Sequence, residues 1–190
     1  MDDLVSRALD LAEVQGAGYA DIRIVRTSQE RISVRSGVVD TLSFDESLGF
    51  GVRVLVNGCW GFASSHDITS KEIDRVTALA ANTAKASSAL SKGAVNLGPP
   101  VTSRGTYTTP IEEDPFTIST DHKLALLMDA DQRMASVKGV RSRQGNLIFI
   151  KEEKTFANSE GAHVEQTVYE AGGGISANAV GNSEIQRRSY

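Results

Sequence analysis

Three histidines and one cysteine are the side chains of this chain best suited to bind a metal ion. A zinc site needs such ligands, or carboxylates, brought together, usually with two of them close in sequence on one element. His66, His122, His163 and Cys59 lack that spacing and fall on separate predicted elements. We interpret His66 and His122 as surface or helix-start residues, His163 as a half-exposed strand residue and Cys59 as a small buried hydrophobe. The sequence therefore predicts no metal ligand.

Side chains for nucleophilic or acid–base chemistry are also present. Ser64, Ser65, His66 and Asp67 contain the residue types of a catalytic triad. A working triad, however, brings its members together from separate elements, and neighbours in sequence rarely point at one another. The paired carboxylates at 112–114 (Glu112, Glu113 and Asp114) and at Glu152 and Glu153 are interpreted as solvated charge. We expect no catalytic residue in this chain.

Gly172, Gly173 and Gly174 lie between two strand-like runs. Consecutive glycines allow the backbone to approach another group closely, to cradle an anion or to turn the chain. A turn is the favoured interpretation, because glycine clusters usually mark one. No cofactor-binding residue is assigned.

The elements that position these side chains are organised around a hairpin at Ser47–Ser65. Asn57-Gly58 separates two runs rich in Val, Leu, Phe and Trp, and this pair tolerates the two positive φ angles of a type I′ turn. The turn predicts that Val56 pairs with Cys59, Leu55 with Trp60, Val54 with Gly61, Arg53 with Phe62 and Val52 with Ala63. One face of the hairpin is then a smooth valine surface. The other is bulky and aromatic, and would be either core, the favoured reading for Trp60, or a docking surface for a partner subunit.

The first half of the chain reads as helix, meander, helix. Apolar spacing predicts a helix at about 3–15, followed by strands at 20–24, 32–34 and 38–44 that join the hairpin in a meander of about five strands. Thr69 and Glu72 form a capping box that begins a second helix. Its small-residue stripe suits close packing on the valine face; the stripe consists of Ile73, Val76, Ala80 and Ala84.

The second half repeats the order of helix and then meander. All four prolines fall between Ser91 and Ser119, which indicates a domain boundary or a strap. Ser119 or Thr120 then begins a third helix, and strands follow with a two-residue turn at Gly145-Asn146. The apolar face predicted for that helix consists of Leu124, Leu127, Met128, Met134 and Ala135. The predicted fold class is α+β, with antiparallel meanders, helices on one face, and divisions at 1–92, 93–118 and 119–190.

Composition sets limits on function. The chain has 190 residues, a net charge of −4 and a single cysteine. A net negative charge offers no basic face for nucleic acid, and no apolar run is long enough to cross a membrane. One cysteine permits no intrachain disulfide, and the acidic N-terminus does not resemble a signal peptide, so we expect a soluble cytoplasmic protein.

Residues Gly49–Ser64, ending in Trp60-Gly61-Phe62-Ala63-Ser64, resemble the N-terminal signature of the TldD/PmbA family, metallopeptidases once called modulators of DNA gyrase. Gly18–Arg23, Asn158–Gly161 and Gln186–Tyr190 agree with the resemblance, which is closer to the TldD branch. The TldD branch carries a His-Glu-x-x-x-His zinc motif downstream, and this chain has no such motif. The resemblance therefore implies the N-terminal portion of a longer protein that continues into a C-terminal metallopeptidase domain.

The resemblance implies zinc in the full-length protein, and none in this portion. It also implies a homodimer or a TldD/TldE-type heterodimer that acts on peptides or unfolded proteins, with this portion contributing substrate enclosure and dimer interface. Whether this portion is part of an enzyme is left open. The alternatives are a non-catalytic subunit of the PmbA/TldE type, or an interaction module whose sheet edges take up an extended peptide.

Overall fold

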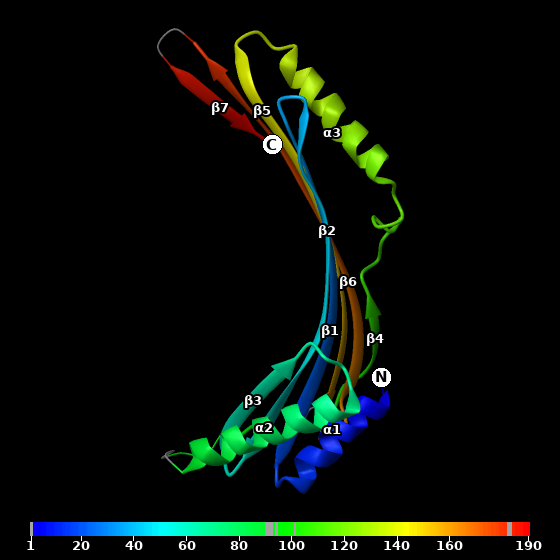
Figure 1. The fold of residues 1–190 in the computed structure, drawn as a ribbon, viewed down its shortest axis with the longest axis vertical. Helices are drawn as coiled ribbons and strands as arrows, with labels where there is room; N and C mark the ends of the chain where they lie inside the picture. The colour runs from blue at the N-terminus through cyan, green and yellow to red at the C-terminus, as the bar shows by residue number, and fades with distance from the viewer. Residues whose placement is uncertain (1, 90–92, 94, 101, 182–183) are drawn as a thin grey trace. The chain divides into compact units, whose positions relative to one another are not determined.

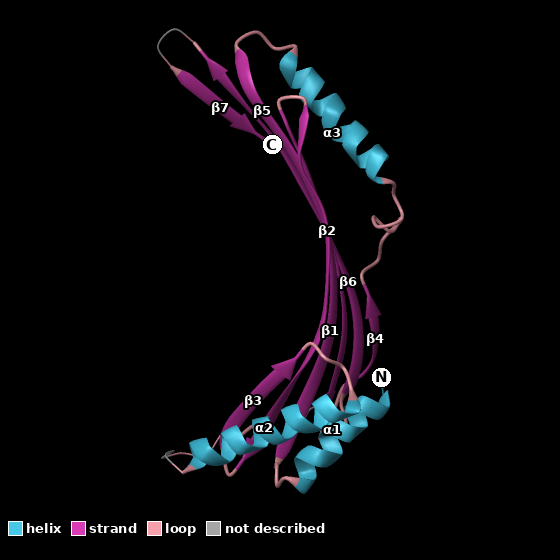
Figure 2. Ribbon diagram, viewed as in Figure 1, coloured by secondary structure: helices cyan, strands magenta, loops and turns pink. Residues whose placement is uncertain are grey.

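The computed structural model describes residues 2–89, 93, 95–100, 102–181 and 184–190, which form three helices and seven strands (Figures 1 and 2). The helices are α1 (Asp2–Val14), α2 (Ser70–Ser88) and α3 (Thr120–Ala135). The strands are β1 (Tyr19–Arg35), β2 (Val38–Val56), β3 (Cys59–Ser65), β4 (Arg104–Thr108), β5 (Val140–Asn158), β6 (His163–Val180) and β7 (Ile185–Ser189). None of the helices described is both long and apolar enough to cross a membrane.

The strands form one sheet in the order β3-β2-β1-β5-β6-β4, and β7 also pairs with β6. The β2–β3 and β6–β7 pairs are antiparallel, which confirms the predicted α+β class with meander strands. β4 was not expected. It lies inside the predicted strap and pairs with β6 in parallel, with Arg104 opposite His163.

The hairpin has the predicted turn and register. Asn57 and Gly58 have φ angles of 49° and 75°, as a type I′ turn requires. Val56 pairs with Cys59, and the pairing continues in the predicted register as far as Phe50 with Ser65. A two-residue sequence, here Asn57-Gly58, is enough to set this register because the turn fixes which residues face each other.

Several predicted strand breaks are wrong. Residues 20–24 and 32–34 belong to the single 17-residue strand β1, and 38–44 continues directly into the hairpin strand to make the 19-residue β2. Gly145 and Asn146 lie inside β5, and Gly172–Gly174 lie inside β6. A Cβ atom on Gly173 would lie 2.8 Å from Leu147 Cδ2, so this glycine makes room for a neighbouring side chain and forms no turn.

The chain folds into two compact units, each assembled from segments far apart in sequence. Unit 1 consists of residues Met1–Arg26, Ser47–Thr108 and Glu152–Thr167. Unit 2 consists of residues Thr27–Glu46, Thr109–Lys151 and Val168–Tyr190. The division predicted from sequence, by contrast, follows chain order. It stays a prediction, and its boundary after residue 92 falls at residues 90–92 and 94, which lie outside the described residues.

In unit 1 the second helix packs on the valine face as predicted. Val52, Val54, Ala80 and Ala84 are fully buried in one core cluster. A Cβ atom on Gly61 would lie 1.9 Å from the carbonyl oxygen of Ala80, so the helix backbone touches the strand backbone at this point. Thr69 caps α2 as predicted, because its Oγ1 accepts a hydrogen bond of 3.3 Å from the Glu72 amide.

In unit 2 the third helix uses part of the predicted face: Leu127 is buried, and Leu124 and Met128 are partly buried against the same cluster. Ser119 caps α3, and Leu127 packs on Ile32 and Val34 with help from neighbouring partly buried side chains. The other two buried residues of the helix are Lys123 and Asp131, one turn to either side of Leu127, whereas Ala135 is exposed. Both buried charges are paired: Lys123 binds Glu30, and Asp131 binds Arg143 at 3.1 Å. Ion pairing is what allows charged residues to occupy a buried helix face.

Candidate metal centre

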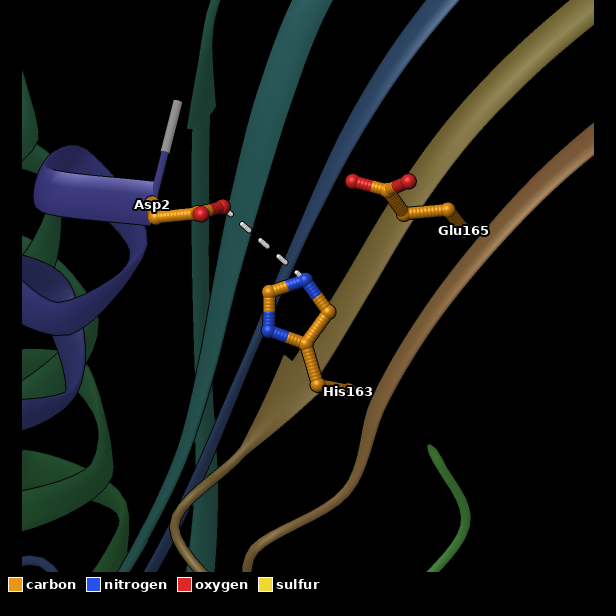
Figure 3. Close-up of side chains that lie close together, drawn as sticks. All are labelled: Asp2, His163 and Glu165. Atoms are coloured by element: carbon orange, nitrogen blue, oxygen red, sulfur yellow. Dashed lines mark ion pairs between the residues drawn. The ribbon is translucent and has the colours of Figure 1, made fainter. Parts of the chain in front are cut away.

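Asp2, His163 and Glu165 form a group of possible metal ligands in unit 1 (Figure 3). One ligand atom from each lies within 4.8 Å of the others. Asp2 Oδ1 is 4.0 Å from His163 Nε2. In Figure 3 the His163 ring faces Asp2, and the Glu165 carboxylate lies on the same side of its strand.

Local structure explains why His163 and Glu165 share a face. His163 is the first residue of β6 and Glu165 follows two positions later, so alternation places both side chains on one side of the strand. The backbone amide of His163 donates a 2.8 Å hydrogen bond to the carbonyl of Ser103, next to β4. Asp2 comes from the first turn of α1, which is anchored by Val5 and Ala8 in the core.

A tight turn at Asn158–Ala162 leads into β6 and fixes its start. The Asn158 side-chain oxygen accepts hydrogen bonds from the amides of Glu160 (3.1 Å) and Ala162 (2.8 Å). Ser159 exchanges two hydrogen bonds with Ala20 of β1, one through its amide and one through its hydroxyl. This segment is one of those that carried the family resemblance, and its structural role is to hold the β5–β6 connection against β1.

A cavity of about 440 Å³ opens beside the three residues. His163 and Glu165 line it together with Arg104, Val5 and Ala157. Arg104 Nε donates a 2.8 Å hydrogen bond to the carbonyl of Gly161, which holds the guanidinium at the cavity wall. In the part of the chain that the structure describes, the site therefore combines two carboxylates and one imidazole with one fixed cation, Arg104.

The other candidate ligands lie elsewhere. His66 is exposed after the end of β3, and His122 is exposed in the first turn of α3, where its amide donates to Ser119 Oγ. Cys59 is buried, as predicted. Within the described residues, no group of three or more possible ligands includes His66, His122 or Cys59.

Several of the candidate nucleophiles and paired carboxylates have local partners. Ser65 Oγ accepts a 3.2 Å hydrogen bond from the Asp67 amide. Asp114 accepts hydrogen bonds from the Phe116 amide (2.8 Å) and the Tyr169 hydroxyl (3.0 Å), so it shapes a loop. Partial burial, followed by the bond to Asp114, raises the pKa of the Tyr169 phenol. Glu112 and Glu113 are exposed, whereas Glu152 lies 3.4 Å from Lys154.

The aromatic face of the hairpin holds a polar cluster. Buried Asp21 pairs with Arg53 at 2.7 Å, and the Arg53 guanidinium lies 4.5 Å from the centre of the Trp60 ring. The Tyr19 ring meets Trp60 edge-on at 5.7 Å, and burial together with Asp21 raises the Tyr19 pKa. Trp60 is half-buried within this cluster, whereas Phe62 is 60% exposed.

Sequence reasoning singled out His163 but found no partner for it. The alternation His163-Val164-Glu165 was a usable signal, because residues two apart on a strand share a face. Asp2 could not have been found in this way, since it joins the group only through the packing of α1.

Comparison with known families matches two regions of the chain. Residues 20–87 match the family model described as PmbA/TldA metallopeptidase domain 1, and residues 113–190 match the PmbA/TldA metallopeptidase central domain. Together these matches cover most of the chain.

Two curated relatives are metalloproteases of archaea. The protein of Methanothermobacter thermautotrophicus is 30% identical over 147 residues, which is 77% of this chain and 31% of the relative. The protein of Methanocaldococcus jannaschii is 26% identical over 147 residues, which is 77% of this chain and 32% of that relative. The chain thus spans about a third of the length of these relatives.

Solved structures share the fold. A protein of Bacteroides thetaiotaomicron described as a candidate modulator of DNA gyrase aligns with a TM-score of 0.76 at 16% identity, over 99% of this chain and 43% of that one. TldE from Thermococcus kodakarensis also aligns with a TM-score of 0.76, at 15% identity, over 98% of this chain and 42% of that one. At these identities the likeness shows the fold alone.

Proposed function

Because this chain belongs to the PmbA/TldD metallopeptidase family, we propose that it is the N-terminal portion of a zinc-dependent metallopeptidase of the TldD type that acts on peptides or unfolded proteins. The two curated metalloprotease relatives support the peptidase reading. The 190 residues contain no His-Glu-x-x-x-His motif, so the proposed catalytic zinc ligands belong to another part of the protein. We place the protein in the cytoplasm.

The role proposed for this portion is to help enclose the substrate, and the observation that carries it is a sheet edge in unit 2. β3 pairs only with Phe50–Val56 of β2, and β2 ends the sheet beyond that point in the part of the chain that the structure describes. The edge segment Val38–Glu46 carries Val38, Leu42 and Phe44, which are 67%, 55% and 59% exposed. An exposed edge with apolar side chains can accept an extended peptide as an added strand.

The second candidate is a non-catalytic subunit of the PmbA/TldE type, favoured by the fold shared with TldE. Either candidate would act as a dimer, as a homodimer or as a TldD/TldE-type pair. Chelator-sensitive cleavage of an unfolded polypeptide by the full-length protein supports the peptidase. Cleavage that appears only when a separate metallopeptidase subunit is added supports the partner subunit.

Peptide binding tests the proposed role of this portion directly. The double variant Val38→Lys/Leu42→Lys should bind a fluorescent unfolded polypeptide about tenfold more weakly in an anisotropy titration, because it places two charges on the docking strand. Leu126→Lys on α3 is the matched control. Leu126 is 59% exposed, between Leu42 at 55% and Val38 at 67%, but it lies on a helix. Equal binding by the edge variant and the control would contradict the proposal.

A further inference from the structure

We propose that Asp2, His163 and Glu165 bind Zn²⁺ or a similar divalent first-row metal ion, which joins the start of α1 to the start of β6. This site is separate from the peptidase motif and does not depend on the proposed function. It departs from the sequence-based expectation that the chain holds no metal ligand, because that expectation had no means of bringing Asp2 to His163. The proposal rests on one observation: one imidazole and two carboxylates, from α1 and β6, lie close together.

The spacing of the donor atoms is close to what such an ion needs. Zinc binds imidazole nitrogen and carboxylate oxygen at about 2.0–2.2 Å, which places neighbouring ligand atoms about 3.3 Å apart. The three candidate atoms already lie within 4.8 Å of one another, and Asp2 and His163 are 4.0 Å apart. Closing the remaining distance requires only side-chain rotation, because Asp2 and Glu165 are both exposed.

The backbone beneath the donors is held in place. His163 is anchored by its amide hydrogen bond to Ser103 and by strand pairing with Arg104. Glu165 pairs with Thr106 in the same ladder. Ligands held on rigid elements lose less conformational entropy on binding, which favours affinity.

The local charge also favours a cation. Two carboxylates face the site. Among the described residues that line the adjoining cavity, Arg104 is the one cation, and its hydrogen bond to Gly161 holds it in place. The donor set, one nitrogen with two oxygens, suits zinc and similar first-row ions. Three protein ligands leave a further coordination position for water or for a group entering from the cavity.

Equilibrium dialysis of the 190-residue chain against Zn²⁺, with metal analysis of the protein, tests the site. We expect one zinc ion per chain for the wild type. His163→Gln and Glu165→Gln should each weaken binding by at least roughly 10–100-fold, the range seen even for residues that support metal ligands indirectly. His122→Gln and Glu170→Gln, which change exposed residues outside the group, are the matched controls and should leave the affinity unchanged.

Thermal unfolding supplies a second readout that does not depend on activity. Zinc should raise the midpoint of the wild type in a concentration-dependent manner, because an ion that binds only the folded state stabilises that state. His163→Gln should fold with the wild-type circular dichroism spectrum and lose the zinc-dependent rise. Absence of stoichiometric zinc in the wild type, or equal binding by His163→Gln, would overturn the proposal.

Discussion

At the residue scale, Glu72 contacts both the capping residue of α2, through its amide, and the first turn of the helix, through its carboxylate. Its side chain accepts two hydrogen bonds from Arg75, at 2.8 and 2.7 Å, while its amide donates to Thr69 Oγ1. The hydrogen bond from Arg75, followed by one from Ser65, lowers the pKa of Glu72 from 4.5 to about 2. A carboxyl with a depressed folded-state pKa stabilises the fold above its unfolded pKa, and that contribution is lost as the pH falls through the folded value.

Replacing Arg75 with Gln should therefore raise the pKa of Glu72 from about 2 toward 4.5. An NMR titration of the Glu72 side-chain carbon between pH 1.5 and about 7 measures this shift directly. Arg133→Gln, which changes an exposed arginine on α3 paired with Asp129, is the control and should leave the Glu72 titration unchanged. A Glu72 pKa that stays near 2 in Arg75→Gln would show that other contacts hold it.

Gly58 is the second position where a single residue decides local structure. Its φ of 75° lies in the left-handed region, which a β-branched residue avoids. Gly58→Val should cost roughly 1–3 kcal/mol of unfolding free energy as a strained backbone position. Denaturant unfolding measures this cost, and an unchanged midpoint would count against strain at this turn. Gly93→Val, at a glycine with nothing within 4 Å of its Cβ position, is a control that should be tolerated better.

At the element scale, the contact between α2 and the hairpin leaves no free space. Ala80 and Ala84 are fully buried, and the Ala80 carbonyl would clash with any side chain at Gly61. Gly61→Leu and Ala80→Leu should each destabilise by roughly 1–3 kcal/mol, the usual cost of forcing methylenes into a filled core. Ala86→Leu, on the exposed side of the same helix, should be close to neutral in the same denaturant unfolding experiment. Equal damage from Ala86→Leu and Ala80→Leu would contradict this packing.

The contact between α3 and β1 includes a buried ion pair. The Lys123 and Glu30 side chains are 4% and 10% exposed, and the Lys123 ammonium also lies 4.7 Å from the centre of the Phe149 ring. Lys123→Met should cost about 3–5 kcal/mol because it leaves a buried carboxylate unpaired. The double variant Glu30→Leu/Lys123→Met should recover most of that loss.

Denaturant unfolding of the single and double variants measures the coupling between the two residues. Arg133→Met is the control. It breaks the exposed ion pair between Arg133 and Asp129, whose side chains are 80% and 57% exposed, and should change stability by less than about 1 kcal/mol. A double variant no more stable than Lys123→Met would show that the ion pair is not the source of the effect.

At the scale of the whole molecule, the two compact units have cores of very different size. Among the described residues, the unit 1 cluster contains 17 buried residues, whereas the unit 2 cluster contains Ile32, Val34 and Leu127 with three partly buried neighbours. Local opening needs less free energy where fewer apolar contacts are buried. The two units should therefore differ in protection, although β1, β2, β5 and β6 contribute residues to both.

Hydrogen exchange followed by mass spectrometry measures this difference. Amides around Ile22, Val52 and Val54 in unit 1 should exchange slowest. Those around Leu147 and Gly173 in unit 2 should exchange faster under the same conditions. Uniform protection along β5 and β6 would mean that the chain opens as one cooperative body.

The chain's own sequence was sufficient for features that depend on near neighbours. Asn57-Gly58 predicted the hairpin register, Thr69 with Glu72 predicted the start of α2, and the small-residue stripe predicted which face of that helix is buried. These features follow from φ preferences, capping hydrogen bonds and periodicity, which act over a few residues. The signature around Trp60 also pointed to the family that the comparisons then showed.

Other features were decided by contacts between distant residues. Gly145 and Gly172–Gly174 resemble turn residues in sequence, yet they lie inside long strands, where atoms of neighbouring residues occupy the space that a side chain would need. Charged Lys123 and Asp131 face the interior because Glu30 and Arg143 meet them there. For the candidate metal site, the sequence predicted His163 as a strand residue but did not pair it with Glu165, which shares its face by alternation. Only the docking of α1 brought Asp2 to them, because a ligand set drawn from two ends of a chain is assembled by tertiary packing.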